Sequence, residues 1–224
     1  MNKEITTIDW GTIQYNKAWE QQEQLFQQTI RQKIEDETTS NYLVLCEHPH
    51  VFTLGKNGSE NNLLINTLQL KSIHAEYLQT NRGGDITYHG PGQIVGYPIF
   101  DLANFDIGLK QYIHNMEEAI INTLRIVGIK AERLDGAAGV WIDTNNPKRC
   151  RKICAIGVRS SHFVTMHGFA LNVNTDLNYF SYINPCGFID KGVTSIQQEM
   201  GKLYPIDIIK NQLKKEFSEI FSRL

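Results

Sequence analysis

Residues 82–99 read RGGDITYHGPGQIVGYPI, and this stretch carries the strongest information about the fold. It contains five glycines and two prolines among residues that favour β-structure. Glycine permits tight turns and close approach of the backbone to another group. The stretch therefore predicts short strands joined by tight turns, with the backbone brought close to another group.

Helical periodicity appears on both sides of this stretch. Apolar residues recur at spacings close to three and four in residues 15–34, 109–127 and 206–224, and Gly128 is a predicted helix stop. The pattern predicts an α/β (α+β) fold, with three helices packed on a mixed, largely antiparallel sheet. Short apolar runs predict strands at residues 42–46, 51–55, 139–143, 152–158 and 165–173.

Length and composition predict a single folded domain over residues 1–224. Hydrophobic residues make up 41% of the chain and charged residues 21%, which allows a sizeable core. The net charge of −2 argues against a general nucleic-acid binder. No apolar run approaches the roughly 18 residues of a membrane span, and the N-terminus lacks a signal-peptide pattern. We expect a cytoplasmic monomer that binds neither nucleic acid nor membrane.

Four cysteines are candidates for packing, metal binding or nucleophilic chemistry. Cys46 lies in an apolar run, which favours packing. Cys186 lies in a Pro-Cys-Gly turn, where a thiol can face a cleft, and the local sequence leaves nucleophile and packing equally open. A cytoplasmic location predicts thiols rather than disulfides for all four, Cys46, Cys150, Cys154 and Cys186.

Neither a metal site nor a phosphate-binding loop is expected. Cys150 and Cys154 form one loose pair without the second close pair of a zinc ribbon, and the histidines at 48 and 50 do not supply it. Residues 82–93 contain neither GxxxxGK[ST] nor GxGxxG. Their glycines are better suited to holding an acyl chain or a pantetheine arm against the backbone.

A nucleophilic cysteine needs a partner that takes its proton, because a thiol with a pKa of about 8.5 is mostly protonated at pH 7. His89 and His167 have glycine neighbours typical of a site, whereas His114 lies in a helical pattern. Lys152 begins the strand KICAIGV, and a desolvated lysine loses its proton more readily. The same lysine also fits the solvated end of the basic run KRCRK, so the partner stays open at this point.

Several segments, taken in order, resemble the lipoyl(octanoyl) transferase family. The stretch RGGDITYHGPGQIVGYP resembles the family signature of Arg-Gly-Gly, Thr, an aromatic residue, His, Gly-Gln and Tyr-Pro. Several motifs in the right order are far more specific than one. The match covers about residues 8–200, and its other segments are LCEHPHVFTLGK at 45–56, KICAIGV at 152–158, HGFALNV at 167–173, NPCG at 184–187 and GVTSI at 192–196.

The resemblance implies a fold like that of biotin and lipoate protein ligases, which share a core with class II aminoacyl-tRNA synthetases. It implies Cys186 as the acyl acceptor and Lys152 as its proton partner. Cys154 departs from the family, which usually has a small residue there, and is expected to be a filler or an oxidation liability. The implied acyl-binding surface consists of Arg82, Gly83, Gly84, Asp85, Ile86, Thr87, Tyr88, His89, Ala155, Ile156, Gly157, Gly168, Phe169 and Ala170.

The implied activity is transfer of an octanoyl or lipoyl group from acyl carrier protein to a lysine of a lipoyl domain. The acceptors would be the lipoyl domains of 2-oxoacid dehydrogenases and the glycine cleavage H protein. No cofactor and no ATP are expected, because exchange between thioesters has a free-energy change near zero and amide formation from a thioester is favourable.

Three alternatives stay open. The first is an ATP-dependent lipoate or biotin protein ligase on the same fold, and the second is a non-catalytic module that binds acyl groups. The third is a papain-like hydrolase using His167 and Asn172, although the surrounding sequence does not fit that family.

Overall fold

A computed structural model describes residues 1–184 and 191–224 of the chain. The strands are β1 Ile5–Thr12, β2 Asn41–Glu47, β3 Val51–Leu54, β4 Glu76–Gln79, β5 Ile86–His89, β6 Gln93–Ile99, β7 Glu132–Leu134, β8 Ala137–Ile142, β9 Arg151–Ser161, β10 Val164–Asn172 and β11 Gly192–Val193. The helices are α1 Tyr15–Ile34, α2 Thr67–Ser72, α3 Leu109–Ile126, α4 Ile196–Met200 and α5 Ile206–Ser222, with 3-10 turns η1 Glu60–Asn62, η2 Leu102–Phe105 and η3 Leu177–Tyr182.

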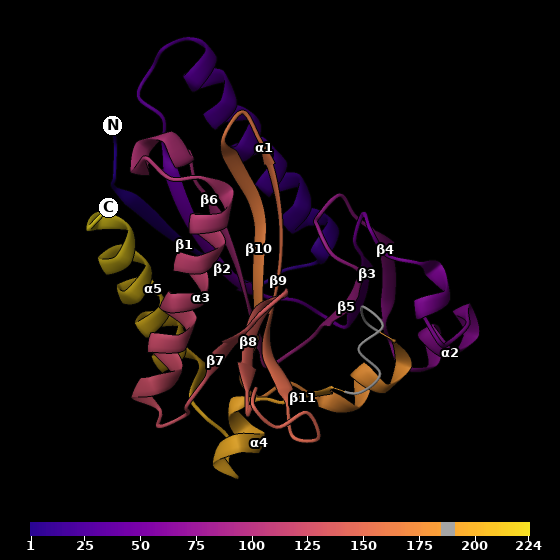
Figure 1. Ribbon diagram of the computed structural model, residues 1–224. Helices are drawn as coiled ribbons and strands as arrows, with labels where there is room; N and C mark the ends of the chain where they lie inside the picture. The colour runs from indigo at the N-terminus through magenta and orange to yellow at the C-terminus, as the bar shows by residue number, and fades with distance from the viewer. Residues whose placement is uncertain (185–190) are drawn as a thin grey trace.

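A large mixed sheet forms the centre of the molecule, and a smaller sheet lies beside it (Figure 1). The large sheet has the order β1-β2-β6-β10-β9-β8-β7, and β11 pairs with β9. Its pairs are antiparallel except β1 with β2 and β11 with β9. The small sheet has the order β4-β3-β5. The predicted mixed, largely antiparallel sheet is confirmed.

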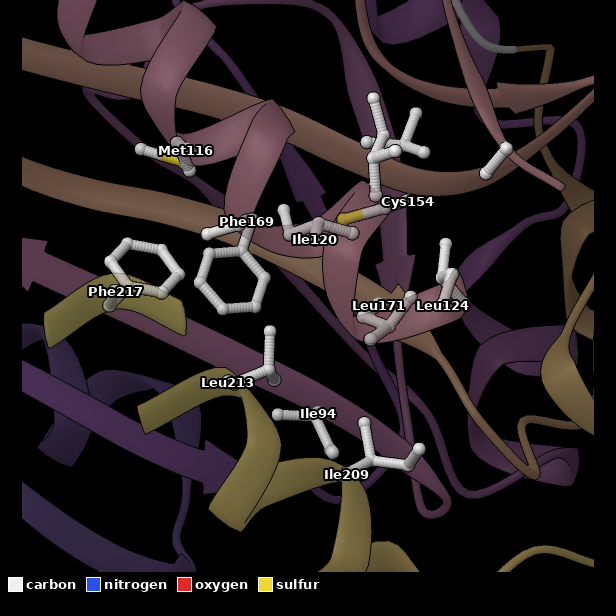
Figure 2. Packing of buried hydrophobic residues seen from close by; sticks show 14 of the residues in the cluster. Ile94, Met116, Ile120, Leu124, Cys154, Phe169, Leu171, Ile209, Leu213 and Phe217 are labelled. Atoms are coloured by element: carbon white, nitrogen blue, oxygen red, sulfur yellow. The ribbon is translucent and has the colours of Figure 1, made fainter. Parts of the chain in front are cut away.

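The helices cover the two faces of the large sheet in a way that follows from strand alternation. Leu43 and Leu45 of β2 belong to the core formed with α3 and α5, whereas Val44 and Cys46 face α1. Figure 2 shows the side of α3 and α5, where Met116, Ile120, Leu124, Ile209, Leu213 and Phe217 pack against Ile94, Cys154, Phe169 and Leu171.

The three predicted long helices are confirmed as α1, α3 and α5. As predicted, α3 stops before Gly128, whose φ of 79° is readily adopted only by glycine. Within the described ranges, no helix has both the length and the apolarity needed to cross a membrane.

Some elements were not predicted. Strand β1 lies at the edge of the large sheet, and its side chains are partly buried or exposed. Helix α2 has six residues, and a capping box between Asn66 and Gln69 stabilises its start. The polar segment at residues 144–151, between the strands predicted at 139–143 and 152–158, does not stay exposed to its end. Cys150 is buried and Arg151 already belongs to β9, because Gly192 of β11 pairs there.

Phe217 tests the core on the side of α3 and α5. It is fully buried on α5, so Phe217→Ala is expected to lower the free energy of unfolding by about 3–5 kcal/mol through lost burial and a cavity. Urea denaturation measures this. Ile208→Ala on the same helix, where the side chain is 51% exposed, is the matched control and should change stability by about 0.5 kcal/mol or less. Equal losses in both variants would contradict the packing described.

Candidate active site

A pocket lies on the α1 side of the large sheet, between that sheet, the small sheet and the loop before β5, and its space, including open solvent at the mouth, is about 980 Å³. Its walls come from α1, residues 82–89, β6, β8, β9, β10, η3 and residues 191–193. The lining residues are Tyr15, Arg82, Gly84, Asp85, Ile86, Thr87, His89, Gln93, Val95, Tyr97, Trp141, Lys152, Ala155, Ile156, Gly157, His167, Gly168, Phe169, Ala170, Asn172, Phe180, Lys191, Gly192 and Val193.

The structure brings nearly all the predicted substrate-binding residues to this pocket, together with Lys152. Gly83 and Tyr88 are the two that do not line it. Cys186 lies outside the described residues, and its role stays a prediction. Phe180 and Lys191, which precede and follow that segment in the sequence, both line the pocket.

Gly83 fixes the glycine-rich loop onto the large sheet. Its N–H donates to the Val158 carbonyl at 3.0 Å. The approach requires glycine on the facing strand, because a Cβ at Gly157 would lie 2.7 Å from the Gly83 carbonyl oxygen. Gly84 then turns the chain with a φ of 87°. Gly83 therefore does not line the pocket but holds the lining residues Arg82 and Gly84 against β9.

Arg82 ties the same loop to the small sheet. Its Nη2 donates to the Thr53 carbonyl at 2.6 Å and its Nε to the Thr53 hydroxyl at 3.2 Å. Nη1 donates to the Gly83 carbonyl at 3.0 Å. The buried guanidinium thus holds β3 and the glycine loop together in addition to lining the pocket.

Tyr88 faces away from the pocket because alternation along β5 turns it into the core of the small sheet. Its ring stacks on Tyr179 at 4.8 Å, and Tyr179 stacks on His50 at 4.3 Å. The Tyr88 hydroxyl lies 2.8 Å from His50 Nδ1. This aromatic ladder holds η3 against the small sheet and so positions the Phe180 wall.

His89 is held neutral inside the pocket wall. Its Nδ1–H donates to Gln93 Oε1 at 2.8 Å, and its Nε2 accepts from the Thr53 hydroxyl at 3.3 Å. Burial, aided by the charge of Arg82, keeps the pKa of His89 well below its usual value. Both ring nitrogens are occupied, so His89 fits the role of a wall residue better than that of a base.

His48 and His167 are neutral for the same reason. The Nδ1–H of His48 donates to the Ile13 carbonyl at 2.7 Å, the Tyr97 hydroxyl donates to its Nε2 at 2.6 Å, and burial lowers its pKa to about 4. His167 Nε2–H donates to Asn81 Oδ1 at 2.6 Å, and burial lowers its pKa to about 3. The two histidines that line the pocket, His89 and His167, are therefore polar but uncharged, as is His48 beside His89.

Lys152 lies on the pocket wall as the second residue of β9. Its Nζ lies 4.5 Å from the ring centroid of Trp141, its cross-strand partner on β8. The Lys152 carbonyl accepts from the N–H of Thr194 at 2.9 Å. Thr194 directly follows β11, so β8, β9 and β11 meet around Lys152.

A buried hydrogen-bond chain connects His89 with the backbone of Lys152. Gln93, which holds His89, donates through Nε2 to Asn172 Oδ1 at 2.9 Å. Asn172 Nδ2 donates to the Thr194 carbonyl at 2.9 Å, and Thr194 holds the Lys152 backbone. The sequence did not predict that Gln93 and Asn172 are hydrogen-bonded to each other. Its one indication of a role for them was that both lie in segments that resemble the family motifs.

Arg151 clamps β9 to α4 beside this chain. It donates to both carboxylate oxygens of Glu199, at 2.7 and 2.6 Å, and Glu199 accepts from the Thr194 hydroxyl at 2.5 Å. Arg151 also pairs with Asp143 at 2.5 Å. The guanidinium of Arg151 lowers the pKa of Glu199, so the clamp is ionised at neutral pH.

The buried thiols behave as packing groups. Cys46 and Cys154 are fully buried, and burial raises the pKa of both. Cys46 as a core residue is confirmed, and the environment of Cys154 favours the filler interpretation over a reactive thiol. Among the described residues, no group of three or more His, Cys, Asp or Glu side chains is arranged to hold a metal ion.

Gly157 tests the docking of the glycine loop. Gly157→Ala should displace Gly83, lower the free energy of unfolding by about 1–3 kcal/mol and speed hydrogen exchange at the Gly83 amide. Gly108→Ala is the control, because a Cβ there meets nothing within 4 Å, and it should leave Gly83 exchange unchanged. Unchanged exchange in Gly157→Ala would contradict the contact.

His48, whose ring lies 5.9 Å from that of His89, tests whether burial holds these histidines neutral. It stays neutral when folded, with a pKa of about 4, but titrates near 6.5 when unfolded, so the unfolded state binds more protons between these values. The free energy of unfolding should therefore fall as pH drops from about 6.5 to 4, by an amount on the order of a few kcal/mol. Urea melts across this range should show a shallower fall for His48→Gln. Exposed His114→Gln should follow the parent, and an equal slope in all three proteins would refute the assignment.

Comparisons with known proteins agree with this geometry. The Lipoyl protein ligase A/B catalytic domain family matches residues 14–218. A protein of Bacteroides thetaiotaomicron named octanoyltransferase is 55% identical over 215 residues, covering 96% of this chain and 94% of that protein. An octanoyltransferase of Cytophaga hutchinsonii is 52% identical, covering 98% and 93%.

Solved structures share the fold at low identity. The bipartite lipoate protein ligase of Thermoplasma acidophilum has a TM-score of 0.72 at 17% identity, over 98% of this chain and 84% of its own. Biotin protein ligase of Aquifex aeolicus has a TM-score of 0.51 at 12% identity, over 99% and 71%. The predicted likeness to lipoate and biotin ligases is confirmed. By sequence, the chain belongs to the octanoyltransferases of the lipoyl protein ligase A/B catalytic domain family.

Proposed function

We propose that the chain transfers octanoyl groups from an acyl carrier protein to a lysine of a lipoyl domain, through a thioester on Cys186. The observation that carries this proposal is a single pocket with an apolar wall and a lining amine. The side chains of Val95 and Ala170 supply the apolar wall, together with the backbone of Ile156 and Phe169, whose side chains pack on the side of α3 and α5. Lys152 lies beside β11. An acyl chain fits the wall, and its carbonyl belongs beside Lys152.

The first half-reaction forms the acyl-enzyme. With the proton of the Cys186 thiol transferred to Lys152, the thiolate attacks the thioester carbonyl of the carrier. The C–S bond to pantetheine breaks, and the departing pantetheine sulfur takes the proton that Lys152 received from Cys186. The N–H of Gly83 is committed to Val158, so the amide of Gly84, on the pocket wall, is the candidate oxyanion donor from this loop.

The second half-reaction delivers the octanoyl group. A neutral lysine of the acceptor domain attacks the Cys186 thioester, its proton passes to Lys152, and the Cys186 thiolate departs. An amide is more stable than a thioester, so this step runs downhill without ATP. Acceptors of this kind are the lipoyl domains of 2-oxoacid dehydrogenases and the glycine cleavage H protein.

The proposed route is tested by intact-protein mass spectrometry with octanoyl-carrier and no ATP. The protein should gain the mass of one octanoyl group, mapping to Cys186, and lose it when an unmodified lipoyl domain is added. Cys186→Ala should form no adduct and transfer nothing. Lys152→Ala should slow both half-reactions by about 10²–10⁴-fold, the contribution expected of a positioned proton carrier.

Cys154→Ala is the matched control, because that thiol is buried in the core, and it should form the adduct normally. Near-normal transfer by Cys186→Ala would rule out the covalent route. Activity that appears only with ATP and free octanoic acid would instead identify an acid-activating ligase on this fold.

A further inference from the structure

The side chain of Lys152 lies in a cradle formed by β8. A Cβ on Gly139 would lie 3.4 Å from Lys152 Cε and 3.6 Å from Cδ, which is ordinary van der Waals contact, so the lysine stem packs alongside Gly139. Two residues further along β8, on the same face, the Trp141 ring receives the Nζ at 4.5 Å. The lysine is therefore directed onto the face of the indole by the strand itself.

The indole is held so that its face stays toward Lys152. Trp141 is 1% exposed, and its Nε1–H donates to the Ala137 carbonyl at 3.1 Å. The negative face of an aromatic ring attracts a cation, most strongly for tryptophan and where water is excluded. A neutral amine gains little from the same contact. The arrangement thus favours the protonated form of Lys152 over the neutral one.

The other charged groups around Lys152 are themselves paired. Glu117 of α3 accepts from Gly139 N–H at 3.0 Å and pairs with Arg133 at 3.1 Å. Arg151 is occupied by Glu199 and Asp143. Among the described residues, the other titratable groups near Lys152 are the buried thiol of Cys154, Lys191, which directly precedes β11, and Asp85 on the pocket wall.

We propose that Trp141 is a positioning residue that holds the Nζ of Lys152, as an ammonium, over its ring in the resting enzyme. The inference rests on the proposed function only where it concerns Cys186. In the resting pair the thiol proton resides on Lys152, and Cys186 is a thiolate ready to attack. The proton leaves with pantetheine in the first half-reaction. It is replaced by the proton of the acceptor lysine in the second, so each cycle restores the ammonium on the ring.

Direct titration of Lys152 tests the contact without relying on catalysis. We suggest following its Nζ resonance by NMR in ¹⁵N-lysine-labelled protein, assigned with Lys152→Arg, in a Cys186→Ser background that removes coupling to the thiol. Trp141→Leu should lower the pH midpoint at which Lys152 loses its proton by about one unit, the effect of losing a desolvated cation–π contact. Trp141→Phe, which retains an aromatic face, should shift it less in the same direction.

Phe221→Leu is the control, since it shortens a fully buried aromatic side chain elsewhere in the core and should leave the midpoint unchanged. If Trp141→Leu does not fold, Trp141→Phe carries the test. Midpoints equal to the parent in the folded Trp141 variants would overturn the proposal, whether or not the protein forms an octanoyl adduct.

A second readout links the contact to the thiol in protein that retains Cys186. Alkylation of Cys186 by iodoacetamide, mapped by mass spectrometry, should shift to higher pH in Trp141→Leu, because a less stable ammonium supports the thiolate less. If the parent forms the octanoyl adduct but alkylation is unshifted in both Trp141 variants, the positioning role fails and the proposed function stands. If the parent forms no adduct, the proposed function fails while the titration of Lys152 still decides the ring contact.

Discussion

The close approach of the glycine loop to β9 is the contact on which the pocket depends. The hydrogen bond from Gly83 to Val158 brings residues 82–84 against the large sheet, and it exists only because Gly157 has no side chain. Arg82 fastens the same loop to Thr53 on the small sheet. Because one short loop is bonded to both sheets, the separation of the sheets, and with it the width of the pocket, is fixed by backbone geometry.

The polar groups of the pocket are arranged so that an apolar chain can lie among them. A charged histidine beside an octanoyl chain would have to be desolvated at a cost of several kcal/mol. His89 lines the pocket, and the ring centroid of His48 lies 5.9 Å from that of His89. Each is neutral, and each has both ring nitrogens occupied by fixed partners. Hydrogen bonding therefore gives the walls rigidity without placing charge on these rings.

The sequence was sufficient for the features that follow from local periodicity. The long helices and the short strands around residues 82–99 appeared where apolar spacing and glycine predicted them. The roles of Trp141 and Asn172 could not be found in this way. Trp141 matters because β9 pairs it with Lys152, and Asn172 because it meets Thr194 across 22 residues. Tyr88 illustrates the opposite error, since alternation turns a motif residue away from the pocket.

The start of β9 is the place where these separate constraints meet. β10 pairs with β9 as far as Cys154, β11 takes up the pairing at Arg151 and Lys152, and β8 occupies the other edge. A register shift between Val140 and Trp141 lets Ile153 and Cys154 both enter the core on the side of α3 and α5 while Lys152 turns into the pocket. The bulge thus places a charged side chain at the end of an otherwise buried strand, and the ring of Trp141 accommodates that charge. The same irregularity that interrupts the sheet therefore brings the lysine of β9 into the pocket, where the proposed reaction requires a proton carrier.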